Sequence, residues 1–295
     1  MKEKKGAQVL LNLFFVLVSL TFVLPMLLVI SVSLTEEKAV LSGGFGLIPR
    51  QFSSLAYKLI LNRPDTLINA YAVTFAQSFL GTIGSMIVGG MVGYAISRSS
   101  FYYKKAVTWF IFFTMLFGGG SIPTYIVYTK AYHLRNSFWV YILPGITGGA
   151  WNILVYRTFF RNLPESLFEA AKLDGASELR TFFRIVMPIS TPVFATIGFM
   201  TLIGKWNDYY TSLVYIRKSS LFTLQYMLQL ILTEAENLKE LAESGINGTT
   251  DALSEAPIET LRYAMCVVAA GPMIFIFPFF QKYFARGLVI GSVKG

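Results

Sequence analysis

Six long apolar stretches constrain this chain more than any other feature of its sequence. A helix needs about 20 apolar residues to cross a bilayer, and each stretch is long enough. Backbone polar groups in lipid must be hydrogen-bonded within the segment, so the stretches are predicted to be helices. They cover residues 9–33, 69–96, 106–128, 138–160, 189–216 and 263–284. The sequence therefore predicts an all-α polytopic membrane protein, with six transmembrane helices in a single domain over 1–295.

The composition and the N-terminal run agree with this fold class. Hydrophobic residues make up 54% of the chain and charged residues 14%, whereas a soluble domain has about 25% charged residues. The chain is apolar from Ala7 to Leu34, which is longer than the apolar core of a signal peptide, about 7–15 residues. We therefore expect the first run to be an uncleaved membrane span.

The charges between the spans predict the orientation. One side of the membrane receives fourteen Lys and Arg and five Asp and Glu, while the other side receives ten of each. The positive-inside rule makes the basic side cytoplasmic and places both termini there. The basic side chains are scattered over loops next to the membrane and form no single patch, which argues against nucleic-acid binding. The cytoplasmic segments are 1–8, 97–105, 157–188 and 282–295, and the external segments are 34–68, 129–137 and 217–262.

The cytoplasmic segment 161–188 has the pattern of two short helices joined by a turn. Pro164 suits a first helical position, and Glu165 places negative charge at the helix N-terminus. Gly175 provides a C-terminal stop with a positive φ, and Ser177 can cap a second helix that runs to Met187. The segment is therefore predicted to be a helix–turn–helix elbow, and a plain solvated loop is the alternative.

The elbow also carries a long motif with fixed spacing: Glu169-Ala170-Ala171, three residues, Gly175, nine residues, Ile185, and then Pro188. It resembles the EAA motif of binding-protein-dependent ABC importer permeases, with Met187 where leucine is usual. The small side chains of Ala170 and Ala171 are expected to let another surface approach closely. The resemblance implies that this surface is a partner ATPase, and we expect Glu169 to meet a basic residue there. The residues predicted to couple to the ATPase are Glu169, Ala170, Ala171, Gly175, Ala176, Ile185 and Pro188.

The resemblance covers most of the chain. "MLFGGGSIPTYIVY", "ILPGITGGAWNILVYRTFF", "GKWNDYY" and "QKYFARGLVIGSVKG" look like the maltose-type carbohydrate permeases, and most like the branch that imports complex oligosaccharides. This implies a type I ABC importer permease fold in the bacterial cell (inner) membrane and transport by alternating access. The implied partners are a second homologous permease, two ATP-binding cassette subunits that bind ATP and Mg²⁺, and an external sugar-binding protein. No cofactor is expected on this chain. The resemblance implies that the apolar tail "FARGLVIGSVKG" reaches the ATPases, and packing on the membrane surface is the alternative.

Polar residues inside the predicted fifth span are candidates for the substrate path. Charges within the membrane are costly and usually face a cavity or a partner, and Lys205 and Asp208 are spaced to be neighbours on one helix. They are either a structural ion pair or part of a polar lining, in which Trp206, Tyr209 and Tyr210 offer stacking faces. The candidate path residues are Lys205, Trp206, Asn207, Asp208 and Tyr209, with Asn152, Tyr156 and Gln77 as weaker ones.

The remaining motifs favour no enzyme activity. "FGGGSIP" (117–123) lacks the Lys-Ser/Thr of a P-loop, and its glycines are expected to permit close helix contact or a bend near Pro123. His133 has no acidic neighbour, and Cys266 lies in an apolar run. With no Walker motif, metal-ligand cluster or nucleophile–base set, the chain is predicted to be neither an ATPase nor any other enzyme.

The external segment 217–262 divides into an apolar part (221–232), expected at the membrane surface, and a polar part (233–257), expected to form a short helix and a loop.

Three functions compete with that of an ABC sugar permease. They are an ion- or proton-coupled secondary transporter that uses Lys205 and Asp208, an ABC permease for a non-sugar solute, and a membrane scaffold. Copurification of an ATPase separates an ABC permease, whatever its solute, from the secondary transporter and the scaffold.

Overall fold

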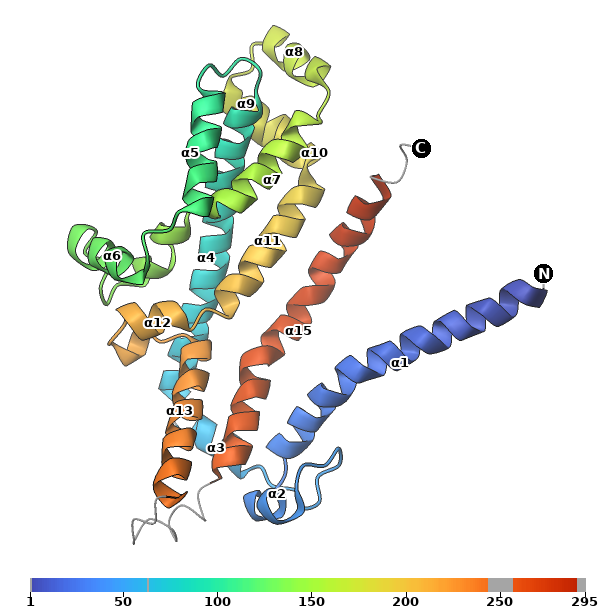
Figure 1. Cartoon of the computed structure of the whole chain (residues 1–295), viewed down its shortest axis with the longest axis vertical. Coiled ribbons are helices and arrows are strands. Elements are labelled where there is room, and N and C mark those ends of the chain that lie inside the picture. Colours follow the sequence, from blue (N-terminus) through green and yellow to red (C-terminus); the bar gives the residue numbers. More distant parts are fainter. Residues whose placement is uncertain (1, 63, 244–256, 291–295) are drawn as a thin grey trace. The chain divides into compact units, whose positions relative to one another are not determined.

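The computed structural model describes residues 2–62, 64–243 and 257–290, and these residues are mostly helical (Figure 1). Among them, the only β-type pairing is an isolated antiparallel bridge between Thr35 and Phe52. The all-α prediction is therefore confirmed for the described residues. The chain divides into two compact units, residues 1–67 with 227–272 and residues 68–226 with 273–295.

Three helices are long and apolar enough to cross a membrane unbroken. They are α1 (Lys2–Ser33), α4 (Pro64–Ser97) and α15 (Ile258–Ile290), and they cover the first, second and sixth predicted spans. Helix α15 runs beyond the predicted end of its span at 284, so part of the apolar tail belongs to this helix.

The predicted third and fourth spans are each a pair of helices with a bend between them, and a third bent pair joins the second elbow helix to the helix of the predicted fifth span. The bend is 112° between Lys104–Leu116 and Ser121–Ala131, 45° between Phe138–Gly145 and Gly149–Arg161, and 85° between Glu178–Ile189 and Thr191–Trp206. The described residues thus hold up to six spans if each pair counts as one. The elements of these pairs are α5 (Lys104–Leu116), α6 (Ser121–Ile126), η1 (Val127–Ala131), η2 (Phe138–Tyr141), η3 (Leu143–Gly145), α7 (Gly149–Arg161), α9 (Glu178–Thr181), η4 (Phe182–Val186), α10 (Met187–Ile189) and α11 (Thr191–Trp206).

The predicted fifth span, 189–216, is wrong as a continuous helix. Helix α11 ends at Trp206, and a separate short helix, α12 (Tyr210–Tyr215), follows. The glycine run before Pro123 does make the predicted bend, and Gly120 has a φ of 83°. No atom lies within 4 Å of a Cβ built on Gly118 or Gly119, so these glycines do not serve close helix contact within the chain.

In the first unit, α1 is followed by two short helices, α2 (Glu37–Gly43) and α3 (Leu55–Leu61). Ser33 at the end of α1 and Tyr57 in α3 share a hydrogen bond of 2.8 Å between their hydroxyls. The apolar side chains of α1 from Val9 to Val23 are exposed. An exposed apolar surface of this length fits contact with lipid or with another subunit.

In the second unit, α4, α7 and α11 enclose an aromatic core. α5 packs on α7, and α7 packs on α11. A Cβ at Gly93 in α4 would lie 2.6 Å from Cβ of Tyr156 in α7, so only glycine permits this approach of the two helices. The buried core residues are Tyr94, Tyr156, Phe160, Phe168, Phe182, Val186, Val193, Phe194 and Ile197.

The external segment differs from the expected division into two parts. One helix, α13 (Leu224–Glu243), follows η5 (Ser219–Leu221) and covers the apolar part and the beginning of the polar part without a break. The rest of the expected loop, residues 244–256, lies outside the described residues.

Candidate functional site: the elbow between α7 and α11

The first elbow helix, α8 (Glu165–Leu173), begins and ends as local sequence chemistry dictates. Pro164 is its N-cap, one residue before the predicted position. At the other end, the amide of Ala176 donates to the carbonyl of Ala171 at 2.9 Å, and that of Gly175 donates to Lys172 at 3.1 Å. Gly175 has a φ of 70°. These bonds form a Schellman motif, and they confirm the predicted glycine stop with positive φ.

The second elbow helix is short and changes its winding. The Ser177 hydroxyl accepts the amide of Arg180 at 3.4 Å, so the predicted N-cap of α9 is confirmed. The chain then forms the π-helical segment η4, which contains Ile185, followed by α10, which contains Pro188. The 85° bend between α10 and α11 follows at Ser190, so the return toward the membrane begins two residues after Pro188.

The two faces of α8 differ. Phe168 and Ala171 are buried in the chain's own core, whereas Glu169 and Ala170 are exposed and Leu173 is 89% exposed. The expectation that both alanines lie at an approachable surface is therefore wrong for Ala171, whose small side chain serves packing inside the chain. The exposed face of α8 combines an acid, a small residue and a leucine, a pattern that fits an uncovered docking surface.

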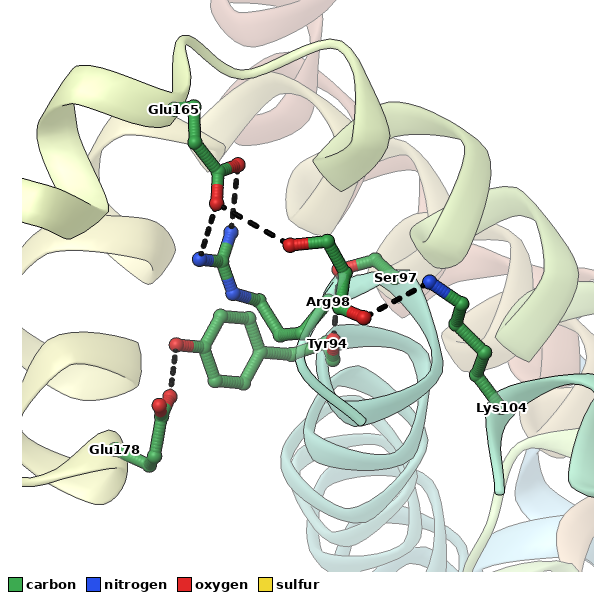
Figure 2. A network of polar contacts seen from close by, with 7 residues as sticks. Tyr94, Ser97, Arg98, Lys104, Glu165 and Glu178 are labelled. Atoms are coloured by element: carbon green, nitrogen blue, oxygen red, sulfur yellow. Dashed lines mark hydrogen bonds and ion pairs between the residues drawn. The ribbon is translucent and has the colours of Figure 1, made fainter. Parts of the chain in front are cut away.

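Arg98, at the end of α4, holds the first elbow helix (Figure 2). Its guanidinium makes a two-pronged ion pair with Glu165, with 3.0 Å from Nη2 to Oε1 and 3.4 Å from Nη1 to Oε2. The same guanidinium lies over the ring of Phe168, with 3.5 Å from Cζ to the ring centroid. Such a fork geometry is specific to arginine, and the ring contact adds a cation–π attraction.

Tyr94, one turn earlier in α4, holds the second elbow helix. Its hydroxyl donates to Oε2 of Glu178 at 2.5 Å, as Figure 2 shows. Its ring centroid lies 5.6 Å from that of Phe182 and 6.2 Å from that of Phe168. Sequence reasoning missed both roles, because Arg98 contributed only to the charge count. The available signal was an aromatic and a base spaced one turn apart at the end of a span.

The candidate path residues Lys205 and Asp208 do not lie side by side on one helix. Nζ of Lys205 donates to the carbonyl of Tyr141 at 2.9 Å. Asp208 lies beyond the end of α11 and accepts the amide and hydroxyl of Thr211, at 3.0 and 2.6 Å, in the first turn of α12. Within the described ranges the recorded ion pairs are Arg98–Glu165 and Arg262–Glu259. The expected neighbouring ion pair is therefore wrong, and hydrogen bonds from Thr211 satisfy the Asp208 carboxylate in its place.

Two aromatic path candidates are buried. Trp206 packs edge-on against Phe75, with ring centroids 5.0 Å apart, and Tyr156 stacks on Phe160. Both side chains are fully buried, so neither presents a ring at the surface of this chain, contrary to expectation. They act as core residues in this arrangement.

The other path candidates are more accessible. Asn207 and Tyr209 are exposed, and Asn207 accepts a hydrogen bond from Gln225 at 3.2 Å. Asn152 is half-buried and donates to the carbonyl of Gly148 at 2.7 Å. The accessible polar residues therefore gather at the break between α11 and α13, and not along one continuous helix.

No group of three His, Cys, Asp or Glu that could hold a metal ion occurs in the part of the chain that the structure describes. His133 is exposed and adopts a φ of 52°, a conformation that suits a turn. Cys266 is a half-buried free thiol in α15. None of these positions gathers the groups that catalysis or metal binding needs.

Comparison with known proteins places this elbow in a family. The sequence profile of a family described as "Binding-protein-dependent transport system inner membrane component" matches residues 4–290. The chain belongs to this family. As an inner membrane component of a binding-protein-dependent transport system, it is a permease subunit and not itself an enzyme, and the elbow with its EAA motif lies within the matched region.

Individual relatives support the same assignment over nearly the whole length. A polygalacturonan/rhamnogalacturonan transport system permease protein, YtcP of Bacillus subtilis (strain 168), is 36% identical over 96% of both chains. An arabinooligosaccharides transport system permease protein, AraQ of the same strain, is 26% identical over 98% of this chain and 96% of its own. A bacterial ABC transporter involved in the import of the acidic polysaccharide alginate contains a chain of similar structure. The match has a TM-score of 0.78 and 26% identity, and it covers 96% of this chain and 98% of that chain.

Proposed function

We propose that this chain is one of two homologous permease subunits of an ATP-driven importer of oligosaccharides. The observation that carries the proposal is the elbow, whose exposed face presents Glu169, Ala170 and Leu173 within the family motif. The similar proteins named above belong to systems that transport polygalacturonan/rhamnogalacturonan, arabinooligosaccharides or alginate. A saccharide substrate is the inference that these names share.

In the proposed mechanism, the elbow receives the motion of two ATP-binding cassette subunits, which bind ATP and Mg²⁺. Their closure on ATP moves the elbow, the helices attached to it rock, and the substrate path opens outward to an external sugar-binding protein. The net charge of +9 on the elbow side supports a cytoplasmic elbow and cytoplasmic termini. Motion at the docking surface drives transport only if the helices have two states that open the substrate path to different sides of the membrane.

The proposed partners account for surfaces that this chain leaves uncovered. Exposed apolar side chains on α1 and α5, such as Phe22 and Trp109, suit lipid and the second permease. The C-terminal residues, of which α15 includes those up to Ile290, are proposed to reach the ATPase dimer. The exposed residues Asn207 and Tyr209 are proposed to line the sugar path, with the second permease completing it.

A secondary transporter is the competing function from another class. It would use Lys205 and Asp208 as a coupling site. The structure gives it little support, because the two side chains bond to different partners: Lys205 to the carbonyl of Tyr141, and Asp208 to Thr211.

Copurification tests the proposal. The chain with Glu169→Lys, expressed with its partner subunits, should lose most of the copurifying ATPase, because a reversed charge repels a basic partner. Glu234→Lys is the control: it reverses an exposed acid on α13, in the proposed external segment, and should leave assembly with the ATPase intact. Vesicle uptake of oligogalacturonate, arabino-oligosaccharide and maltodextrin would then identify the saccharide class. Failure of the unmodified chain to bring down any ATPase would refute the proposal.

A further inference from the structure

We propose that Tyr94 and Arg98 are positioning residues that fasten the elbow to α4, so that the elbow and α4 move as one body. We call these two residues the α4 clamp. The inference rests on the proposed function, in which the elbow receives the motion of the ATPases. It adds the route by which that motion leaves the elbow.

Arg98 grips α8 through two residues that lie one turn apart. Glu165 takes both prongs of the guanidinium, and Phe168 lies beneath it. The Arg98 side chain is only 13% exposed, although that of Glu165 is 56% exposed. A bidentate pair with one largely buried partner is stronger and less mobile than an ordinary surface pair. A displacement of α8 therefore pulls on Arg98.

Tyr94 grips the second elbow helix in the same manner. The hydroxyl binds Glu178, and the ring contacts Phe182 at 5.6 Å between centroids. Each residue of the clamp thus holds one acid and one aromatic residue of a different elbow helix. The turn at Gly175 would otherwise let the two elbow helices move independently, and the clamp bridges it.

The helix that carries the clamp suits the transmission of motion. α4 is continuous over 34 residues, whereas the three bent spans, among them the α11 span that follows the elbow, are broken by bends of 45° to 112°. A push on a bent span can be absorbed at its bend, while a continuous helix carries it along its length. Motion at the clamp therefore reaches the other end of α4.

At that other end, α4 binds the break between α11 and α13. Gln77 donates to the carbonyl of Lys205 at 2.5 Å, and the hydroxyl of Thr74 accepts the amide of Leu224 at 2.9 Å. Both α4 side chains are fully buried. The two bonds border the segment that presents Asn207 and Tyr209, so a tilt of α4 would move the accessible polar residues of the proposed path.

Spin-label distances test whether the elbow and α4 move together. Labels are placed on Ser166→Cys in α8 and Ala72→Cys in α4, both exposed positions, in a Cys266→Ser background. The complete complex with its ATPases is measured without nucleotide and after trapping with ATP and vanadate. In the otherwise unchanged chain, the distance distribution between the labels should be the same in both states.

Loss of the α4 clamp should let the elbow and α4 move separately. With Arg98→Gln or Tyr94→Phe, trapping should shift or broaden the distance distribution between the two labels, because α8 can then move without α4. Glu165→Gln should reproduce Arg98→Gln, and the double variant should be no worse than either single one. Lys104→Gln is the matched control, because the Lys104 ammonium donates to the carbonyl of Ser99 and not to a side chain of the elbow.

The outcomes separate this proposal from the one on which it rests. If trapping leaves the distribution in Arg98→Gln and Tyr94→Phe the same as in the unchanged chain, the clamp does not transmit motion. If no ATPase assembles with the unchanged chain, the proposed function fails instead. A purely structural clamp would lower thermal stability but leave the response to trapping as it was, and that result would also overturn the proposal.

Discussion

The carboxylate of Glu37 holds the first turn of α15 through Thr260. The amide and hydroxyl of Thr260 donate to Oε2 at 2.9 and 2.8 Å, and the amide of Glu259 donates to Oε1 at 2.9 Å. Glu37 is 8% exposed. A carboxylate at this position satisfies amides that have no partner within the helix, and it complements the helix dipole. The contact joins α2 to a helix that begins 221 residues later in the chain.

Removing this carboxylate should destabilise the protein. Glu37→Ala should lower the free energy of unfolding by about 2 kcal/mol, because buried donors lose a charged acceptor. Glu36→Ala is the matched control, since Glu36 is exposed and its side chain makes no capping hydrogen bond. Thermal unfolding of both purified variants in detergent measures the difference. Equal midpoints would mean that the contact contributes nothing to stability.

The sequence revealed Glu37 only as one of ten external acids, because its partners lie more than 220 residues away. The same limit applies to Arg98 and Tyr94, whose elbow partners are 67 and 84 residues distant. Spacing along the chain predicts contacts within a turn or two of a helix. The contacts of Glu37, Arg98 and Tyr94 join different helices. Side-chain pairing between elements needs the packed structure.

The turn and cap of the elbow were predictable because they depend on neighbouring residues only. The positive φ of Gly175 and the Ser177 cap follow from a few adjacent residues, and both were confirmed. Hydropathy located the spans but not their bends. The run through 216 reads as one span because apolar residues flank Asn207 and Asp208, yet Asp208 bonds to Thr211 and starts a new helix. A polar side chain that can cap locally ends a helix that hydropathy alone would continue.

The turn at Gly175 gives a second prediction. Gly175→Val should reduce ATP hydrolysis stimulated by the binding protein, because the positive φ costs a residue with a side chain about 1–2 kcal/mol. No atom lies within 4 Å of a Cβ built there, so the cost comes from the backbone and not from a clash.

Gly271→Val is the control for this substitution. Gly271 is also free of neighbours around a built Cβ, but it has an ordinary helical φ. Valine should therefore be tolerated at Gly271, since it has a higher helix propensity than glycine. Normal stimulation in Gly175→Val would mean that the elbow tolerates a distorted turn.

The contact between Gly81 and Lys205 gives a third prediction. A Cβ at Gly81 would lie 2.5 Å from Cε of Lys205, so Gly81→Ala should push the ammonium away from the carbonyl of Tyr141. The loss of that hydrogen bond should cost about 1 kcal/mol in the free energy of unfolding.

A double-mutant cycle isolates this contact. In a Lys205→Ser background, Gly81→Ala should cost almost nothing, because the side chain that it displaces is gone. Thermal unfolding of the four proteins measures the coupling. Additive costs would show that Gly81→Ala acts through some other neighbour.

The external segment after α12 gives the last prediction. We expect it to dock the sugar-binding protein, because α13 projects a run of acids and long loops in compact proteins are usually functional or disordered. Replacing 236–255 with a short Gly/Ser linker should lower binding-protein-stimulated ATP hydrolysis, while basal hydrolysis and membrane insertion persist.

A second variant with Glu234, Glu236 and Glu240 changed to Gln keeps the helix and removes only charge, so it separates electrostatic attraction from shape. If charge guides the encounter, the glutamine variant should slow association most at low salt. Full stimulation in the shortened variant would move the docking surface elsewhere, and residues 34–68 would be the next segment to replace.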